Sequence, residues 1–286
     1  MANLKEIRNR ITSIGSTMQI TSAMKMVSAA KLKKAQDAIT AMRPYSAKLT
    51  ELLQNLSATL DSDVGGAFSE QRVAHKVLLV VVTSNRGLCG GFNSSVIKGA
   101  ISHIHEKHAN STVDVFTIGK KGNDILSKQY SVLENRNDVF DDLNFNTISE
   151  IAEKLMQSFV DGSYDRIELI YNRFKNAATQ ITTIEQFLPI EPLENDIASN
   201  VEYLFEPKKE EIILELIPKS LKTQLYKSVR DSYASEHGAR MTAMHKATDN
   251  AKDLRDELLL KYNKARQAAI TNEILEIVGG AEALNN

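Results

Sequence analysis

The sequence lacks most of the features from which enzymes and membrane proteins are commonly recognised. Its 286 residues include no tryptophan and one cysteine, Cys89, so an intrachain disulfide is excluded and a reducing compartment is favoured. The P-loop pattern G-x-x-x-x-G-K-[ST] does not occur. The longest apolar run, Val77 to Val82, is strand-sized and far short of the roughly 20 residues of a membrane span.

The first ten residues, MANLKEIRNR, have neither the apolar core of a signal peptide nor the serine-rich, acid-free character of a transit peptide. We therefore expect a cytoplasmic protein, or one that is peripheral on a membrane through its partners. Charge is unevenly distributed: the net charge is -1, yet residues 1–50 carry nine Lys and Arg against two acidic residues. This split predicts different partners for the ends and the middle of the chain.

Residues 1–60 are predicted to form a coiled-coil helix. Apolar residues recur there at steps of three and four, at Leu4, Ile7, Ile11, Ile14 and Met18. Beyond them the predicted seam is small and mixed, which would let two helices approach closely; it comprises Ser22, Ala23, Val27, Ala29, Ala30, Ala35 and Ala38. A proline inside a helix costs about 3 kcal/mol, so Pro44 predicts a kink or break.

Residues 75–205 are predicted to form a Rossmann-like, doubly wound α/β domain. The β-branched run 77–82 is typical of a strand buried on both faces. A helix is expected over 94–107, a strand over 113–118, a helix over 149–160, and strands over 166–174 and 181–187. Alternation of strands and helices indicates a mostly parallel sheet.

Residues 210–286 are predicted to form a second coiled-coil helix, antiparallel to the first. After Pro218 the stretch contains no further proline, and a helix over 219–286 would span roughly 90–100 Å. Its seam is predicted at Met244, Ala247, Ala251, Leu254 and Leu258, continuing with a phase slip at Tyr262, Ala265 and Ala269. The final residues are apolar, with Glu282 the only charge after Glu276, which predicts a tip enclosed by other chains.

The turn TSNRGLCGGFN, residues 83–93, follows the first strand and opens a helix, as phosphate-binding turns do. Its glycines do not have the G-x-G-x-x-G spacing, so we favour a structural turn involving Arg86, Gly87, Gly90 and Gly91. Cys89 is more simply a structural thiol than a reactive one.

Two clusters of basic residues are considered as possible binding sites. His103, His105 and His108 lie at spacings that put their rings on different sides of a helix, so we expect solvated histidines and no metal site. The basic stripe of Lys25, Lys31, Lys33 and Lys34 has no interleaved aromatics, which weakens a nucleic-acid interpretation. Contact of this stripe with acidic loops of another protein is an alternative that the sequence leaves open.

Three segments together resemble the gamma subunit of F-type ATP synthases. The start, NLKEIRNRITSIGSTMQITSAMKMVSAAKLKKAQ, is similar to that family's N-terminus. The glycine-rich turn is similar to the family's T-S-D-R-G-L-C-G-G-x-N pattern, with Asn85 in place of Asp. The end, YNKARQAAITNEILEIVGGAEAL, resembles the C-terminal signature of the family. The resemblance therefore spans the whole chain.

The resemblance implies a rotor shaft that couples proton flow to ATP synthesis and hydrolysis on beta subunits. The chain itself would have no catalytic residue and no cofactor. Its implied partners are three alpha and three beta subunits, the epsilon subunit and the c-subunit ring, with no nucleic acid and membrane contact only through the complex. By resemblance, the contacts with beta are Met24, Lys25, Arg266, Gln267 and Thr271.

Two other functions are considered from the residues alone. The α/β domain could be a nucleotide-binding enzyme, which predicts nucleotide binding by the isolated chain. Alternatively, the chain could be a coiled-coil scaffold that tethers nucleic acid or membrane through its N-terminal lysines, which predicts salt-sensitive binding to polyanions. Neither explains both the length of the helices and the apolar tip.

Overall fold

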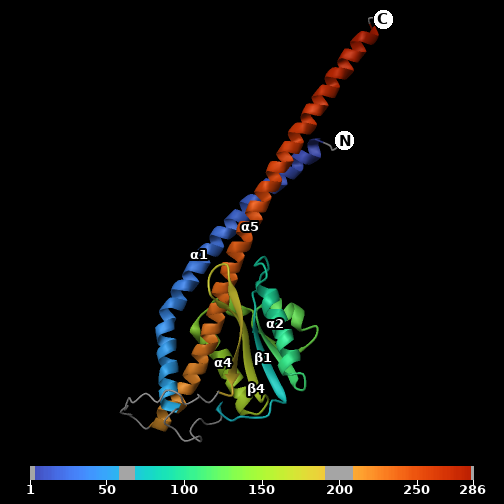
Figure 1. The fold of residues 1–286 in the computed structure, drawn as a ribbon. Coiled ribbons are helices and arrows are strands. Elements are labelled where there is room, and N and C mark those ends of the chain that lie inside the picture. The colour runs from blue at the N-terminus through green and yellow to red at the C-terminus, as the bar shows by residue number, and fades with distance from the viewer. Residues whose placement is uncertain (1–3, 58–67, 191–208, 285–286) are drawn as a thin grey trace. The chain divides into compact units, whose positions relative to one another are not determined.

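The computed structural model describes residues 4–57, 68–190 and 209–284 (Figure 1). The chain divides into two compact units, one of Met1–Ser28 with Met241–Asn286 and the other of Ala29–Arg240. Two long helices, α1 (Leu4–Ser57) and α5 (Lys209–Leu284), contribute to both units. Residues 191–205, at the end of the predicted central domain, lie outside the described residues, and the domain boundaries stay predictions.

A five-stranded sheet forms the centre of the 29–240 unit, with strand order β3-β2-β1-β4-β5. The strands are β1 (Lys76–Val82), β2 (Thr112–Ile118), β3 (Ser131–Asn135), β4 (Arg166–Phe174) and β5 (Gln180–Leu188). Pairing is parallel except between β4 and β5, which confirms the predicted mostly parallel α/β sheet. The short edge strand β3 was not predicted, because it is only half-buried and has no continuous apolar run.

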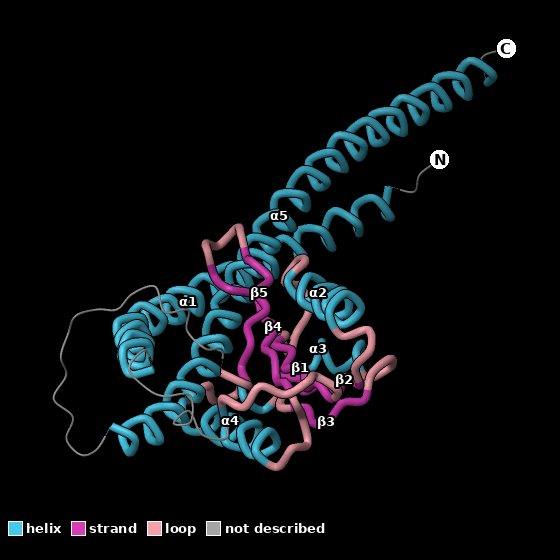
Figure 2. The backbone as a smooth tube through the Cα atoms, turned by 60° about the horizontal axis from the view of Figure 1, so that its bottom comes forward, coloured by secondary structure: helices cyan, strands magenta, loops and turns pink. Residues whose placement is uncertain are grey.

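Helices cover both faces of the sheet (Figure 2). They are α2 (Phe92–Lys107), α3 (Lys120–Leu126) and α4 (Phe145–Val160), with a 3-10 turn at Asp138–Phe140. On one face, Leu78 and Val80 of β1 pack with α4 and with the first part of α5. On the other face, Leu79 and Val81 pack under α2. The run 77–82 is therefore buried on both faces, as predicted.

In the other unit, α1 and α5 form the predicted antiparallel pair. Figure 1 shows the N-terminal end of α1 and the C-terminal end of α5 at the same end of this pair, with α5 running farther. The hydroxyls of Thr21 and Thr248 meet across the two helices at 2.8 Å. The predicted early seam residues of α1, from Leu4 to Met18, are all half-buried.

The seam of α1 beyond Met18 differs from the prediction. Its steps of three and four continue without interruption through Thr21, Lys25 and Ser28, and then through Leu32, Ala35 and Ile39, all of them buried or half-buried. Ala23, Val27 and Ala30 are exposed, contrary to prediction. The prediction followed apolar side chains, whereas the helical repeat fixes which positions face inward even where they are polar.

The seam of α5 requires the same correction. Thr248 and Arg255 occupy inward positions, whereas Leu254 is 42% exposed. With these two residues included, the steps of three and four run from Met244 to Ala269 without the predicted phase slip. Pro44 lies inside α1 and Pro218 inside α5. Of the kink or break predicted at Pro44, the break does not occur, and the kink stays a prediction.

Candidate functional site

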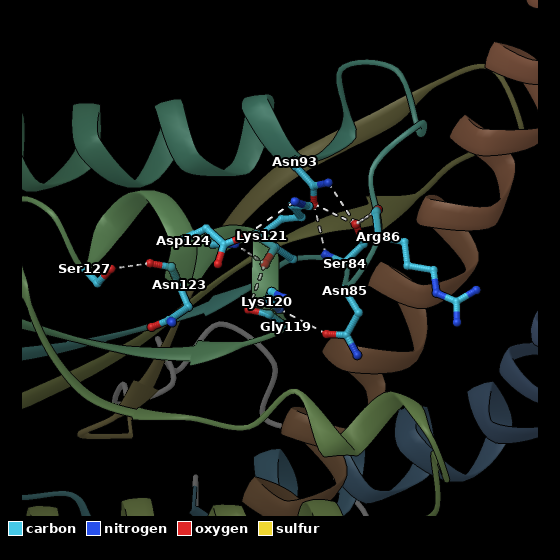
Figure 3. Close-up of polar contacts among 12 residues, drawn as sticks. Ser84, Asn85, Arg86, Asn93, Gly119, Lys120, Lys121, Asn123, Asp124 and Ser127 are labelled. Atoms are coloured by element: carbon cyan, nitrogen blue, oxygen red, sulfur yellow. Dashed lines mark hydrogen bonds and ion pairs between the residues drawn. The ribbon is translucent and has the colours of Figure 1, made fainter.

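The glycine-rich turn, residues 83–93, lies at the carboxyl edge of β1 (Figure 3). The side chain of Asn93 closes it: Oδ1 accepts from the Ser84 amide at 2.9 Å, and Nδ2 donates to Ser84 Oγ at 2.8 Å. Gly90 has φ +59°, a region that favours glycine, whereas Gly91 has φ -80°. Arg86, Gly87, Gly90 and Gly91 are all exposed.

The segments that follow β2 and β3 both contact this turn. Asn85 Oδ1 accepts from the Lys120 amide at 3.0 Å, and Asn85 Nδ2 donates to the Asn137 carbonyl at 2.8 Å. Gly119 has φ +107°, and a Cβ atom there would lie 2.1 Å from the Thr83 carbonyl oxygen. Doubly wound sheets bind ligands at this carboxyl edge. Here the chain's own loops fill the edge beside β1 and β2.

Helix α5 also packs onto the turn. Cys89 and Phe92 form a small buried cluster with Ala239. One Arg240 nitrogen, Nη2, donates to the carbonyls of Arg86 and Gly87 at 3.0 and 3.3 Å, and the other, Nη1, contacts Glu236 Oε1 at 2.5 Å. A phosphate cradle presents amide donors. At this position the turn presents carbonyl acceptors that are already engaged by a guanidinium.

Burial changes the acidity of the groups beneath the turn. It raises the pKa of Glu236 even though the nearby charges of Arg240, Lys31 and Arg86 act in the opposite direction. Burial likewise raises the pKa of the Cys89 thiol, against the lowering effects of Ser84 and Arg240. A buried thiol with a raised pKa is a poor nucleophile, so these contacts support a structural cysteine.

His237 is a buried histidine of α5 close to the turn. Its side chain is buried, and neither ring nitrogen has a hydrogen-bond partner among the described residues. Its ring packs edge-on against Tyr233, with centroids 4.5 Å apart. Burial, with the positive charges of Arg240 and Lys31, lowers the pKa of His237 to about 3. The imidazole is therefore neutral at physiological pH.

The residues expected to contact a beta subunit do not form one cluster within this chain. Met24 and Lys25 are half-buried on α1, whereas Arg266, Gln267 and Thr271 are exposed on α5. The Thr271 hydroxyl donates to the Gln267 carbonyl at 2.9 Å, one turn away. Because Thr21 faces Thr248, Met24 lies near residue 245, which is about 30 Å along α5 from Arg266.

The expectation of solvated histidines holds only for His105. His103 is half-buried and His108 is buried, and both contact Glu168 of β4. The prediction failed because it placed all three rings on a regular helix. His108 is the residue that ends α2, with φ -123°, and so leaves the helical repeat. The partner, Glu168, is distant in sequence, so spacing alone could not have identified the cluster.

Similarity to known proteins extends over almost the whole chain. A family model described as ATP synthase matches residues 3–284. A protein of Flavobacterium psychrophilum called ATP synthase gamma chain is 71% identical to this chain and aligned over 99% of each. The chain therefore belongs to the ATP synthase gamma chain family.

Solved structures agree with this assignment. A chain of the central stalk and c-ring structure of the mitochondrial ATP synthase of Tetrahymena thermophila aligns with a TM-score of 0.60 at 27% identity, covering 80% of this chain and 99% of that one. A chain from the Euglena gracilis mitochondrial ATP synthase shares the fold, with a TM-score of 0.70 at 22% identity over 98% and 94%. Within the described ranges, no helix of this chain is long and apolar enough to cross a membrane.

Proposed function

We propose that this chain is the central rotor shaft of an F-type ATP synthase and carries no catalytic side chain. The observation that carries the proposal is the end of α5. Past Ala269 every described residue is exposed, including Ile270, Ile274 and Ile277 at steps of four and three. Leu275 and Val278 are also exposed, at 63% and 53%. An apolar helix surface of this kind requires an enclosing partner.

The enclosing partner is a ring of three alpha and three beta subunits, and the other partners are an epsilon subunit and a c-subunit ring. This assembly would sit on the cytoplasmic face of a bacterial plasma membrane. Membership of the gamma chain family and the unpaired tip support it. In physical terms, each angle of the shaft stabilises some conformations of a beta subunit more than others. The shaft therefore shifts the conformational equilibrium as a ligand with different affinities for the conformations would.

Copurification tests this assembly. The complex is extracted from the native membrane through a tag on this chain, and its subunits are counted by native mass spectrometry. Three alpha and three beta subunits per copy are expected. As a control, Ile274→Asp with Ile277→Asp places charges in the tip, and this variant should lose alpha and beta subunits while the isolated chain stays folded. Recovery of the unmodified chain without alpha and beta would contradict the proposal.

The coupling contacts are tested at Met24. Met24→Lys adds an ammonium to a half-buried position that the proposal places against beta. A charged hydrogen bond formed in only one rotary state, worth about 1.5–3 kcal/mol, would slow the next step roughly tenfold or more. We expect fewer protons pumped per ATP hydrolysed in inverted vesicles, with Met24→Leu as the uncharged control. A normal pumping ratio in Met24→Lys would remove Met24 from the contact.

A further inference from the structure

A cluster of two imidazoles and one carboxylate lies where the C-terminal end of α2 packs over β4. His103 belongs to the last turns of α2, and His108 directly follows that helix. Glu168 is the third residue of β4, and Ile170, two residues on, packs under α2. Since side chains alternate along a strand, Glu168 faces α2 as well.

The three side chains converge on one carboxylate oxygen. Glu168 Oε2 lies 2.6 Å from His103 Nε2 and 2.9 Å from His108 Nε2. The three donor atoms all lie within 4.8 Å of one another. The two rings pack edge-on, with centroids 5.1 Å apart. The side chains of His108 and Glu168 are only 5% and 7% exposed, whereas His103 is 14% exposed and gives a route from solvent.

An arginine and the end of a helix flank this carboxylate. The other carboxylate oxygen, Oε1, faces Arg166 Nη1 at 3.6 Å, so Oε2 is left to the two imidazoles. This ion pair, which is too long for a hydrogen bond, holds the carboxylate with Oε2 towards the two imidazoles. The cluster also lies at the C-terminal end of α2, where the helix dipole favours positive charge.

We propose that His103, His108 and Glu168 bind a divalent transition-metal ion of the zinc type, with water at the fourth position. Two imidazoles and one carboxylate are an established donor set for Zn²⁺, whereas Mg²⁺ and Ca²⁺ prefer oxygen donors alone. The ion takes a lone pair from each Nε2, so each neutral imidazole carries its hydrogen on Nδ1.

Binding requires a rearrangement of the three donor atoms. Metal–ligand bonds of about 2.0–2.1 Å in a tetrahedral site separate neighbouring donors by about 3.3 Å. The two nitrogen–oxygen distances, 2.6 and 2.9 Å, must therefore lengthen, and the two Nε2 atoms, which lie within 4.8 Å of each other, must approach to the same separation. Rotation of the His103 and Glu168 side chains supplies these movements. Because the ligands come from α2 and β4, the bound ion links the helix to the sheet and stabilises the domain by mass action.

The test uses the full-length chain, freed of metal by dialysis against a chelator. Co²⁺ is added first and followed by its visible absorption, and Zn²⁺ then competes for the same site. His103→Gln and Glu168→Gln each remove one ligand while keeping a polar side chain of similar size. His105→Gln is the matched control, because His105 lies on the same helix but is exposed and outside the cluster.

We expect one Co²⁺ per chain, displaced by Zn²⁺, and a melting temperature that rises with Zn²⁺ concentration. Changes to the groups around metal ligands lower metal affinity roughly 10- to 100-fold, so loss of a ligand should lower the affinity for Co²⁺ at least as much. The affinity of His105→Gln should be unchanged. In histidine-labelled unmodified chain, Zn²⁺ should shift the NMR signals of His103 and His108 and leave His105 unchanged. Absence of saturable binding, equal binding by the ligand variants, or a shift at His105 alone would overturn the proposal.

Discussion

The hydroxyl oxygens of Thr21 and Thr248 lie 2.8 Å apart although 227 positions separate the two residues in sequence. This contact sets the register of the antiparallel pair. With Thr21 opposite Thr248, Lys25 falls opposite Met244 and Ile14 falls opposite Arg255. The same register carries α5 beyond the start of α1, which accounts for the exposed tip.

Replacing either threonine with valine should loosen this part of the helix pair. A single Thr21→Val or Thr248→Val change leaves the other hydroxyl with only a backbone carbonyl of its own helix, that of Met18 for Thr21 and that of Met244 for Thr248. We expect a cost of about 0.5–1 kcal/mol for either single change, whereas the double variant should be nearly as stable as the unmodified chain. Hydrogen exchange of the amides of residues 18–28 measures the local opening free energy. Thr12→Val, on an exposed face, is the control. Strictly additive losses would show that the two hydroxyls do not interact.

The coiled-coil pair and the sheet were predictable because each depends on local periodicity. A continuous apolar run such as 77–82 indicates a doubly buried strand, and steps of three and four indicate a seam. The prediction went wrong where polar residues occupy seam positions, as at Thr21, Lys25 and Arg255. A search for apolar side chains assigns neighbouring apolar residues to the seam in place of these polar ones. Continuing the repeat in strict steps of three and four would have assigned the polar residues correctly.

The candidate site was less predictable because its contacts are long-range. Glu168 looks like an ordinary strand residue until α2 brings His103 and His108 over it. Likewise, nothing local marks Arg240 as the partner of the Arg86 and Gly87 carbonyls, which lie more than 150 residues away in the chain. Such polar contacts depend on packing of the complete domain, and patterns within a short stretch of sequence give no information about them.

Arg240→Met should strongly destabilise the 29–240 unit. The change leaves Glu236 buried without its partner, removes the Arg240 donor from the Gly87 carbonyl, and leaves the Arg86 carbonyl with the Ser84 hydroxyl. Both side chains are about one-tenth exposed, so solvent screening is weak, and the loss should be about 3–5 kcal/mol in the free energy of unfolding. Urea denaturation followed by tyrosine fluorescence measures it. Adding Glu236→Gln should recover part of the loss, and a single-variant cost below about 1 kcal/mol would contradict the proposed pairing.

Asn85→Asp should weaken the contact between the two loops at the sheet edge. The carboxylate can still accept from the Lys120 amide, but it cannot donate to the Asn137 carbonyl. We expect a loss of about 0.5–1 kcal/mol, the net contribution of one hydrogen bond, because Asn137 is exposed and water can replace the lost donor. Thermal unfolding of the full chain measures the change, and Asn110→Asp, at an exposed position, is the control for added charge. Equal effects of the two substitutions would assign the loss to charge alone.

His237 should make the 29–240 unit less stable in acid. The groups that face it are Tyr233, Arg240 and Lys31, with Glu236 adjacent in sequence, and its pKa in the folded state is about 3. An unfolded histidine has a pKa of about 6.5. Between pH 6.5 and about pH 3, His237 binds a proton in the unfolded chain but not in the folded chain. The stabilisation is therefore complete above pH 6.5 and is lost progressively as the pH falls towards 3.

The comparison that isolates this effect is His237→Phe, which keeps an aromatic ring against Tyr233 and removes the titration. Relative to this variant, the unmodified chain should lose about 2 kcal/mol of unfolding free energy between pH 7.5 and pH 5, since each pH unit below 6.5 contributes up to about 1.4 kcal/mol. Urea denaturation at a series of pH values measures the difference. His245→Gln, at an exposed site, should follow the unmodified chain. If the His237→Phe and unmodified curves have the same slope, His237 is protonated in the folded state and its burial does not control acid stability.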